Sequence, residues 1–223
     1  GTATIAVSLV ADALTDANTI TITALGSTAS VVVNDTSTTA EVIASALTTA
    51  TNTVDFSGNT LASTIDGSTA NSWNTFDAIT GGDASDTLTA TVGAAIQPSM
   101  SAVENLIITT TAGNSLDMVN VTGLNSITSQ SSTAVATFTN LQTVGSIGFS
   151  ANNLAASLGY TAAATSGTAD VLTINMQGVN QAGNLIVGAT TNTIETISVS
   201  STVTANTIND LQSTTAGTTI LNV

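Results

Sequence analysis

The chain has no lysine, arginine or histidine among its 223 residues, whereas fourteen residues are aspartate or glutamate. Its formal net charge is therefore −14 at pH 7. No side-chain carboxylate can form an ion pair with another side chain, so self-repulsion has to be tolerated or neutralised by bound cations. The groups left for structure and recognition are carboxylates, hydroxyls, amides and the backbone.

The missing residue types exclude several classes of function. DNA and RNA binding needs cationic side chains that neutralise phosphates. Ser–His and Cys–His nucleophile pairs cannot form, because the chain has neither His nor Cys. A P-loop lysine and an arginine finger are excluded in the same way. We therefore expect a protein that is not an enzyme and that binds no nucleic acid.

The composition predicts a mainly β fold. Hydrophobic residues make up 42% of the chain, aromatic residues 3% and charged residues 6%, with a single proline. Disordered chains usually combine low hydrophobicity with high charge, which is not the case here. The abundant Thr and Val residues are β-branched and favour strands.

The absence of cysteine fits a bacterial extracellular protein of moderate size, which needs no disulfides. No apolar run approaches the roughly 20 residues of a membrane-spanning helix, so we expect no transmembrane segment. The chain does not open at Gly1 with the basic and apolar regions of a signal peptide. We expect an extracellular or bacterial cell-surface location.

The acidic residues are distributed unevenly, since nine of the fourteen lie between Asp12 and Asp86. This asymmetry and the Gly81-Gly82 pair predict a boundary, with a small α+β module over residues 1–76 and a β-rich, repeat-like domain over residues 77–223.

The strongest helix pattern lies in the first module. Thr38 and Glu41 have the spacing of a capping box, in which each side chain accepts a hydrogen bond from a free N–H group. Ile43, Ala46 and Leu47 follow at helical spacing. The sequence therefore predicts one helix over about 38–50.

The second domain is predicted to consist of short strands, because apolar residues alternate with Thr, Ser and Asn. Clear examples of alternation are Leu172–Met176 and Ile194–Val199, and the apolar run Leu106–Ile108 predicts another strand. The alternation is compatible with a β-solenoid and with a β-sandwich, and the sequence alone leaves both open.

An internal similarity favours repeated β units. Asp86-Thr87-Leu88-Thr89 resembles Asp170-Val171-Leu172-Thr173, and Val103–Ile108 resembles Ile194–Val199. The interval from Asp86 to Glu104 is shorter than that from Asp170 to Glu195, so the unit contains loops of variable length. Repeats of this kind suggest stacked units that share a core; the alternative is chance similarity in a chain built from few residue types.

Four segments carry a resemblance to a known family. The segment Thr80–Leu88 resembles one turn of an RTX-type repeat, and Val103–Ile108, Ser115–Met118 and Gly167–Asn175 resemble the Thr/Ala-rich β repeats of Gram-negative surface-layer (S-layer) proteins. The resemblance implies an exported, calcium-dependent protein that assembles into a coat. Only one RTX-like turn is present and Ala84 replaces one of its glycines, so a calcium-binding roll of tandem repeats is not expected.

Calcium prefers about six to eight hard oxygen ligands from carboxylates, carbonyls and water. Asp77, Asp83 and Asp86 form the densest acidic stretch and flank the Gly-Gly pair, so they are the candidate metal ligands. The alternative is a solvated loop in which Asp86 caps a turn with its side chain.

Two further patterns have alternative explanations. Glu104 and Glu195 lie within apolar strings, where they form either an acid/base couple of the glycosidase type or outward-facing strand residues, which we prefer. Thr-x-Thr pairs such as Thr89–Thr91 and Thr137–Thr139 can form flat hydroxyl arrays on one strand face, as in ice-binding solenoids.

Together these features predict a structural, self-assembling extracellular protein, namely an S-layer or cell-surface coat subunit that calcium stabilises. Its expected partners are copies of itself and cell-surface polysaccharide. The alternatives are a subunit of an extracellular filament assembled by β-strand donation, and an adhesin or ice-binding module.

Overall fold

The computed structural model describes residues 3–9, 19–23, 28–35, 42–151, 155–189, 191, 193–202, 205–214, 218 and 220–222. Within these ranges the regular structure consists of strands, without any helix. No helix long and apolar enough to cross a membrane occurs in them either. The prediction of a mainly β protein is confirmed.

The strands form three sheets, in which every pairing is parallel. Sheet A contains β1 (Ala3–Leu9), β3 (Thr28–Asp35), β5 (Thr51–Asp55), β7 (Ala78–Thr80), β9 (Ser99–Ser101) and β12 (Asn120–Thr122). Sheet B contains β2 (Thr19–Thr23), β4 (Val42–Ala46), β6 (Ser63–Gly67), β8 (Thr87–Val92), β10 (Asn105–Thr110), β13 (Ser126–Gln130), β15 (Ser146–Ser150), β17 (Val171–Gln177), β19 (Thr196–Thr202) and β21 (Ile220–Asn222). Sheet C contains β11 (Asn114–Asp117), β14 (Ala136–Leu141), β16 (Ala156–Tyr160), β18 (Asn180–Ala189) and β20 (Thr207–Ser213).

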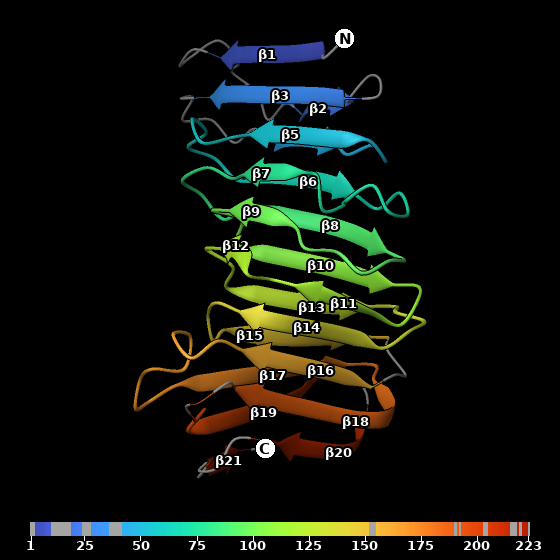
Figure 1. Cartoon of the computed structure of the whole chain (residues 1–223), viewed down its shortest axis with the longest axis vertical. Helices are drawn as coiled ribbons and strands as arrows, with labels where there is room; N and C mark the ends of the chain where they lie inside the picture. The colour runs from blue at the N-terminus through green and yellow to red at the C-terminus, as the bar shows by residue number, and fades with distance from the viewer. Residues whose placement is uncertain are drawn as a thin grey trace.

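The chain winds as a β-solenoid, because successive strands alternate between sheets and each strand pairs with the strand one coil away (Figure 1). Coil length varies along the stack. Thr87 pairs with Asn105 across a short coil, whereas Ala156 pairs with Leu185 across a much longer one. The structure thus decides between the two predicted architectures of the β-rich part in favour of the solenoid.

Sheet B runs through the whole stack, while the sheet opposite changes from A to C. The chain passes from β10 to β11, β12 and β13, and thereby visits sheets B, C, A and again B. After β12 the chain adds no further strand to sheet A, and from β13 onward it alternates between sheets B and C in the part that the structure describes.

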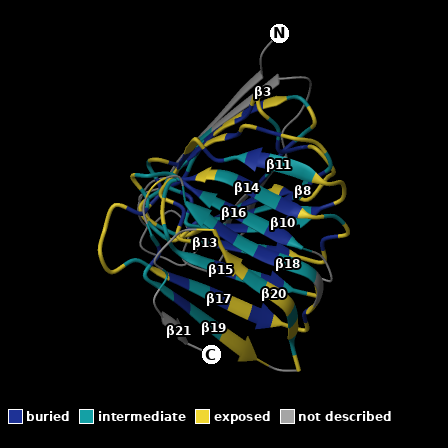
Figure 2. Ribbon diagram, turned by 60° about the horizontal axis from the view of Figure 1, so that its bottom comes forward, coloured by how far each residue is buried: buried dark blue, intermediate teal, exposed yellow. Residues whose placement is uncertain are grey.

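Along most strands from β5 to β17 every second side chain lies in the core, as the pleat of a strand requires. In sheet B the buried residues form a column in which each side chain stacks on its partner in the next coil. The column consists of Ile65, Leu88, Leu106, Ile127, Ile147 and Ile174. Figure 2 shows the same alternation of buried and half-exposed residues in sheet C. The aliphatic columns therefore hold the coils together.

The predicted helix over about 38–50 is wrong. Val42–Ala46 form strand β4, which pairs with β2 on one side and with β6 on the other. Residues 47–50 are not helical either, and the amide of Leu47 donates to the carbonyl of Asp66 in the next coil. Neighbouring coils supply the backbone hydrogen bonds that a helix would make locally. The capping-box pair Thr38 and Glu41 lies outside the described residues.

Hydrogen-bonded pairs of strands span the boundary expected at residue 76. Strand β5 pairs with β7 and β6 pairs with β8, so both ladders continue from residues 1–76 into residues 77–223. The division into two domains stays a prediction.

The internal similarity is confirmed as structural. Most of Asp86–Thr89 lies in β8 and most of Val103–Ile108 in β10, and these strands are neighbours in sheet B. The matching segments Asp170–Thr173 and Ile194–Val199 lie mostly in β17 and β19, which are neighbours too. Leu88 pairs with Leu106, and Leu172 pairs with Ile197. The two unequal intervals between the similar segments are thus the lengths of single coils.

We expect Leu106→Ala to lower the free energy of unfolding by about 2–5 kcal/mol, because it leaves a cavity in the buried column between Leu88 and Ile127. Thr128→Ala on the outward face of β13 is the matched control and should change it by less than about 0.5 kcal/mol. Chemical denaturation followed by circular dichroism measures both values. Equal effects would contradict the assignment of inward and outward faces.

Candidate functional site

Five of the acidic residues, Asp77, Asp86, Glu104, Asp170 and Glu195, lie at corners directly before a strand. Asp86 immediately precedes β8 and is completely buried. One of its carboxylate oxygens accepts a hydrogen bond from the amide of Ser63, at the start of β6, over 2.6 Å. The other accepts from the amide of Gly82, also over 2.6 Å. This carboxylate therefore ties the start of one strand to the start of the strand one coil earlier.

Gly81 makes this corner possible. A Cβ atom at Gly81 would lie 1.7 Å from the carbonyl oxygen of Ala102 in the next coil and 2.5 Å from Oδ2 of Asp86. No side chain fits in that space. The Gly-Gly pair is thus explained by the close approach of two coils around a buried carboxylate.

Glu104 continues the arrangement into the next coil. Its Oε2 accepts a hydrogen bond from the amide of Asp86 over 2.8 Å. The same contact recurs farther along the stack, where Oε2 of Glu195 accepts from the amide of Asp170 over 2.8 Å. Both glutamates immediately precede a strand of sheet B and cap the strand before it.

The two glutamates do not form an acid/base couple. Glu104 lies at the start of β10 and Glu195 at the start of β19, with β13, β15 and β17 between them in sheet B. Four strand spacings correspond to about 19 Å, whereas the carboxylates of glycosidases lie within about 10 Å of each other. The preferred interpretation, in which both glutamates are outward-facing strand residues, is also incomplete. Each carboxylate accepts a backbone amide at the start of the neighbouring strand.

Asp77 is buried at a different corner, directly before β7. Its Oδ1 accepts from the amide of Asn52 over 2.7 Å and from Nδ2 of the same residue over 3.1 Å. Its Oδ2 accepts from the amide of Asn74 over 2.8 Å. Asp77 therefore connects β5, the β6–β7 loop and β7.

The geometry gives little support to a calcium ion shared by Asp77, Asp83 and Asp86. All four carboxylate oxygens of Asp77 and Asp86 accept N–H groups, and Asp83 is exposed. In the described part of the chain, no group of three or more acidic side chains is placed to hold a metal ion. The expected metal site stays a prediction.

A surface ladder of amides and a carboxylate was not predicted. Asp117 accepts hydrogen bonds from Nε2 of Gln97 over 2.7 Å and from Nδ2 of Asn140 over 2.8 Å. The three residues lie on successive coils, 20 and 23 residues apart. These spacings equal coil lengths, which is the signal that could have indicated the ladder.

The environments of the carboxylates shift their pKa values in opposite directions. Burial raises the pKa of Asp77, and burial together with the nearby charge of Glu104 raises the pKa of Asp86, against the opposing effect of their backbone hydrogen bonds. The hydrogen bond from Asn140 lowers the pKa of Asp117, and the hydrogen bond from the Thr193 hydroxyl lowers that of Glu195.

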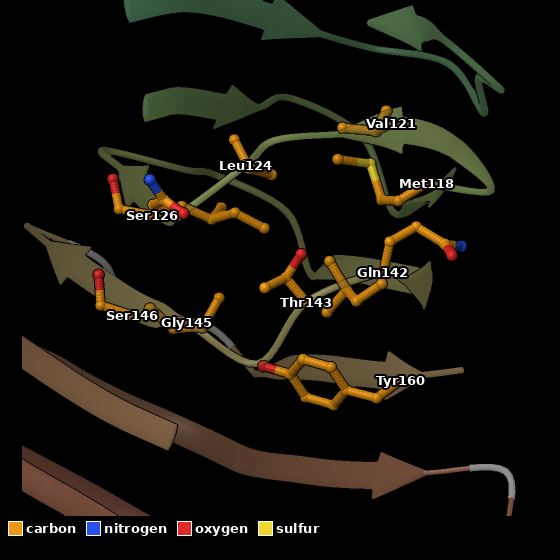
Figure 3. A pocket seen from close by; sticks show the side chains of 13 residues that line it. Met118, Val121, Leu124, Ser126, Gln142, Thr143, Gly145, Ser146 and Tyr160 are labelled. Carbon is orange, nitrogen blue, oxygen red and sulfur yellow. The ribbon is translucent and has the colours of Figure 1, made fainter. Parts of the chain in front are cut away.

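A small cavity lies where sheet A ends. It is lined by residues of β12, β13 and β15, by the loops before and after β12 and by the β14–β15 loop, with Tyr160 below (Figure 3). The chain crosses directly from β14 to β15 through Gln142 and Thr143, so Val121 has no successor in sheet A. The space is about 20 Å³, enough for about one water molecule. It is a packing defect of the sheet change and too small for an organic substrate.

Comparison with protein-family models, with curated proteins and with solved structures finds no match for this chain. Its function has to be inferred from its own geometry.

Asp86→Ala should lower the free energy of unfolding by about 1–3 kcal/mol, because the buried amides of Ser63 and Gly82 lose their acceptor. Asp83→Ala, three residues away on an exposed position, is the matched control and should have almost no effect. Urea denaturation of both variants measures the difference. A neutral Asp86→Ala would show that the corner does not depend on this carboxylate.

The stability difference between the wild type and Asp86→Ala should grow as the pH falls through the raised pKa of Asp86 toward about 4. A carboxyl group whose pKa is higher in the folded state binds a proton more readily there, so it adds stability on acidification until the unfolded-state pKa near about 4 is reached. Comparison with the variant removes the general relief of charge repulsion. A difference that shrinks on acidification would contradict the sign of the shift.

Proposed function

We propose that the protein is a structural, self-assembling extracellular protein, a subunit of an S-layer or of another cell-surface coat. The observation that carries the proposal is the use made of the carboxylates. The buried carboxylates of Asp77 and Asp86 accept backbone N–H groups at coil corners, where they stabilise the stack. The faces of the solenoid carry mainly hydroxyl and amide groups, which suit extended contacts.

The resemblance of the Thr/Ala-rich segments to Gram-negative S-layer proteins supports the same proposal. Calcium belongs to it as a counter-ion for a chain with a net charge of −14. Exposed carboxylates such as Asp66, Asp83 and Asp210 are open to cations from solvent. Cell-surface polysaccharide is the proposed anchor of the coat.

Electron microscopy of purified protein in calcium-containing buffer should reveal two-dimensional arrays. Removal of calcium with EDTA should disperse them, because repulsion between the acidic subunits is then less well neutralised. The matched control is EDTA supplied together with excess calcium. Protein that remains monomeric at high concentration under every salt condition would contradict the proposal.

A filament assembled by strand addition is the second candidate. Strand β20, the last described strand of sheet C, supports it, because its Ile208 and Leu211 are only partly buried and a donated strand could cover them. Microscopy separates the two candidates, since a filament extends in one dimension and should survive EDTA.

An adhesin or ice-binding module is the third candidate. Thr87, Thr89 and Thr91 lie on the outward face of β8, and Thr137 and Thr139 on that of β14, so hydroxyl arrays of the expected kind are present. Inhibition of ice recrystallisation by the monomer would favour this candidate over both assemblies.

A further inference from the structure

We propose that the outward face of sheet B between β8 and β19 is a surface through which two copies of this chain associate face to face. The inference rests on the proposed self-assembly and names the surface that performs it. The charge, the chemistry and the relief of this face support it.

The face lacks ionisable side chains over six consecutive strands, β8, β10, β13, β15, β17 and β19. Their outward residues are Thr, Ser, Asn, Gln, Gly, Val and Ile. The adjacent strand β6 presents the exposed Asp66, and the described part of sheet C presents Asp117 on β11 and Asp210 on β20. Two copies that each carry a net charge of −14 can approach closely where charges are absent.

Hydroxyl and amide groups can both donate and accept hydrogen bonds, so the face is complementary to itself. The outward residues stack in columns across the coils. One column consists of Thr87, Asn105, Ser126, Ser146, Thr173 and Ser198. None of the outward residues on these six strands is aromatic, so the face offers no ring on which a sugar could stack. These properties favour a second copy over a glycan.

The face also has a knob and a hollow. Ile107 projects outward from β10 and is half-buried. Two strands farther on, in the same column, Gly148 lacks a side chain and is one of the residues that line a shallow hollow of about 150 Å³. Thr128, Ser150, Asn175 and Gln177 are among the residues that surround it.

The positions of knob and hollow fit a twofold dimer. Thr128 lies between Ile107 and Gly148, since it pairs with both. A suitable twofold axis lies just outside the face, parallel to β13 and next to Thr128. Rotation about this axis turns the faces of the two copies toward each other and places β10 of one copy opposite β15 of the partner. It therefore places Ile107 of each copy opposite Gly148 of the partner, as an isologous interface requires.

The size of the face predicts a weak contact. Six strands about 4.8 Å apart and about 17 Å long cover roughly 500 Å², slightly below the roughly 600 Å² per partner of the smallest specific interfaces. Asp86, Glu104, Asp170 and Glu195 precede four of the strands. The same axis places these acidic edges together, so added salt or calcium should strengthen the association.

The first experiment is sedimentation velocity of the full chain with Ile107→Asp, and with Ile186→Asp as the matched control. Ile186 is also a half-buried, outward-facing isoleucine in the middle of a strand, but it lies on β18 of sheet C. We expect Ile107→Asp to weaken association at least about tenfold, because it buries an uncompensated charge, and Ile186→Asp to leave it unchanged. Circular dichroism and denaturation establish that both variants are folded.

The second experiment uses the absence of natural cysteines. Thr128→Cys lies near the proposed axis, and opposed sheets lie about 10 Å apart, so a short bis-maleimide should convert this variant into a covalent dimer. Thr137→Cys on the outward face of β14 is the control and should remain largely uncross-linked. This test does not depend on a destabilising substitution.

The outcomes separate the two proposals. Assembly of the wild type that both aspartate variants weaken equally, or cross-linking through Thr137→Cys instead of Thr128→Cys, overturns this interface but leaves the proposed self-assembly intact. A wild type that never associates overturns both. Binding of monomer to ice or to a neutral polysaccharide through Ile107, without dimers, assigns the face to another partner and also overturns the inference.

Discussion

Backbone amides and side-chain amides take the place of cations in this molecule. Asp86 accepts the amides of Ser63 and Gly82, Asp77 accepts those of Asn52 and Asn74, and Glu104 accepts the amide of Asp86. Most of these donors belong to a neighbouring coil, so each contact exists only while the coils are in register. The stacking of the aliphatic columns and the stabilisation of the carboxylates therefore depend on each other. If the columns separate, the amide–carboxylate hydrogen bonds are exposed to water, and if these hydrogen bonds are lost, the columns are exposed.

Local alternation was sufficient to predict the strands, because an apolar residue at every second position has the same meaning in any parallel sheet. Sequence patterns failed at residues 38–50, where a capping-box spacing and apolar residues at helical spacing favoured a helix. The hydrogen-bond partners of β4 lie in β2 and β6, about one coil away in either direction, and no local pattern contains them. The solenoid itself was not distinguishable from a sandwich, because coils of unequal length hide a fixed period.

The candidate site shows the same limit. Asp77, Asp83 and Asp86 are close in the sequence, but β7 and a tight corner separate the first from the last, and their carboxylates serve different coils. The contacts that do form join residues about one coil apart, such as Gln97, Asp117 and Asn140. The similarity between the Asp86–Glu104 and Asp170–Glu195 segments was the long-range signal that the sequence analysis used, and it identified two pairs of adjacent strands.

Variation in coil length has a practical consequence. A long loop, residues 161–170, joins β16 to β17. Strands β15 and β17, which are adjacent in sheet B, nevertheless remain paired residue by residue. The solenoid thus accepts extra residues in the loops at its corners without a change in the pairing of its strands. Foreign peptides inserted at such a corner would be presented at regular intervals on any assembly of this protein, which makes the scaffold suitable for epitope display.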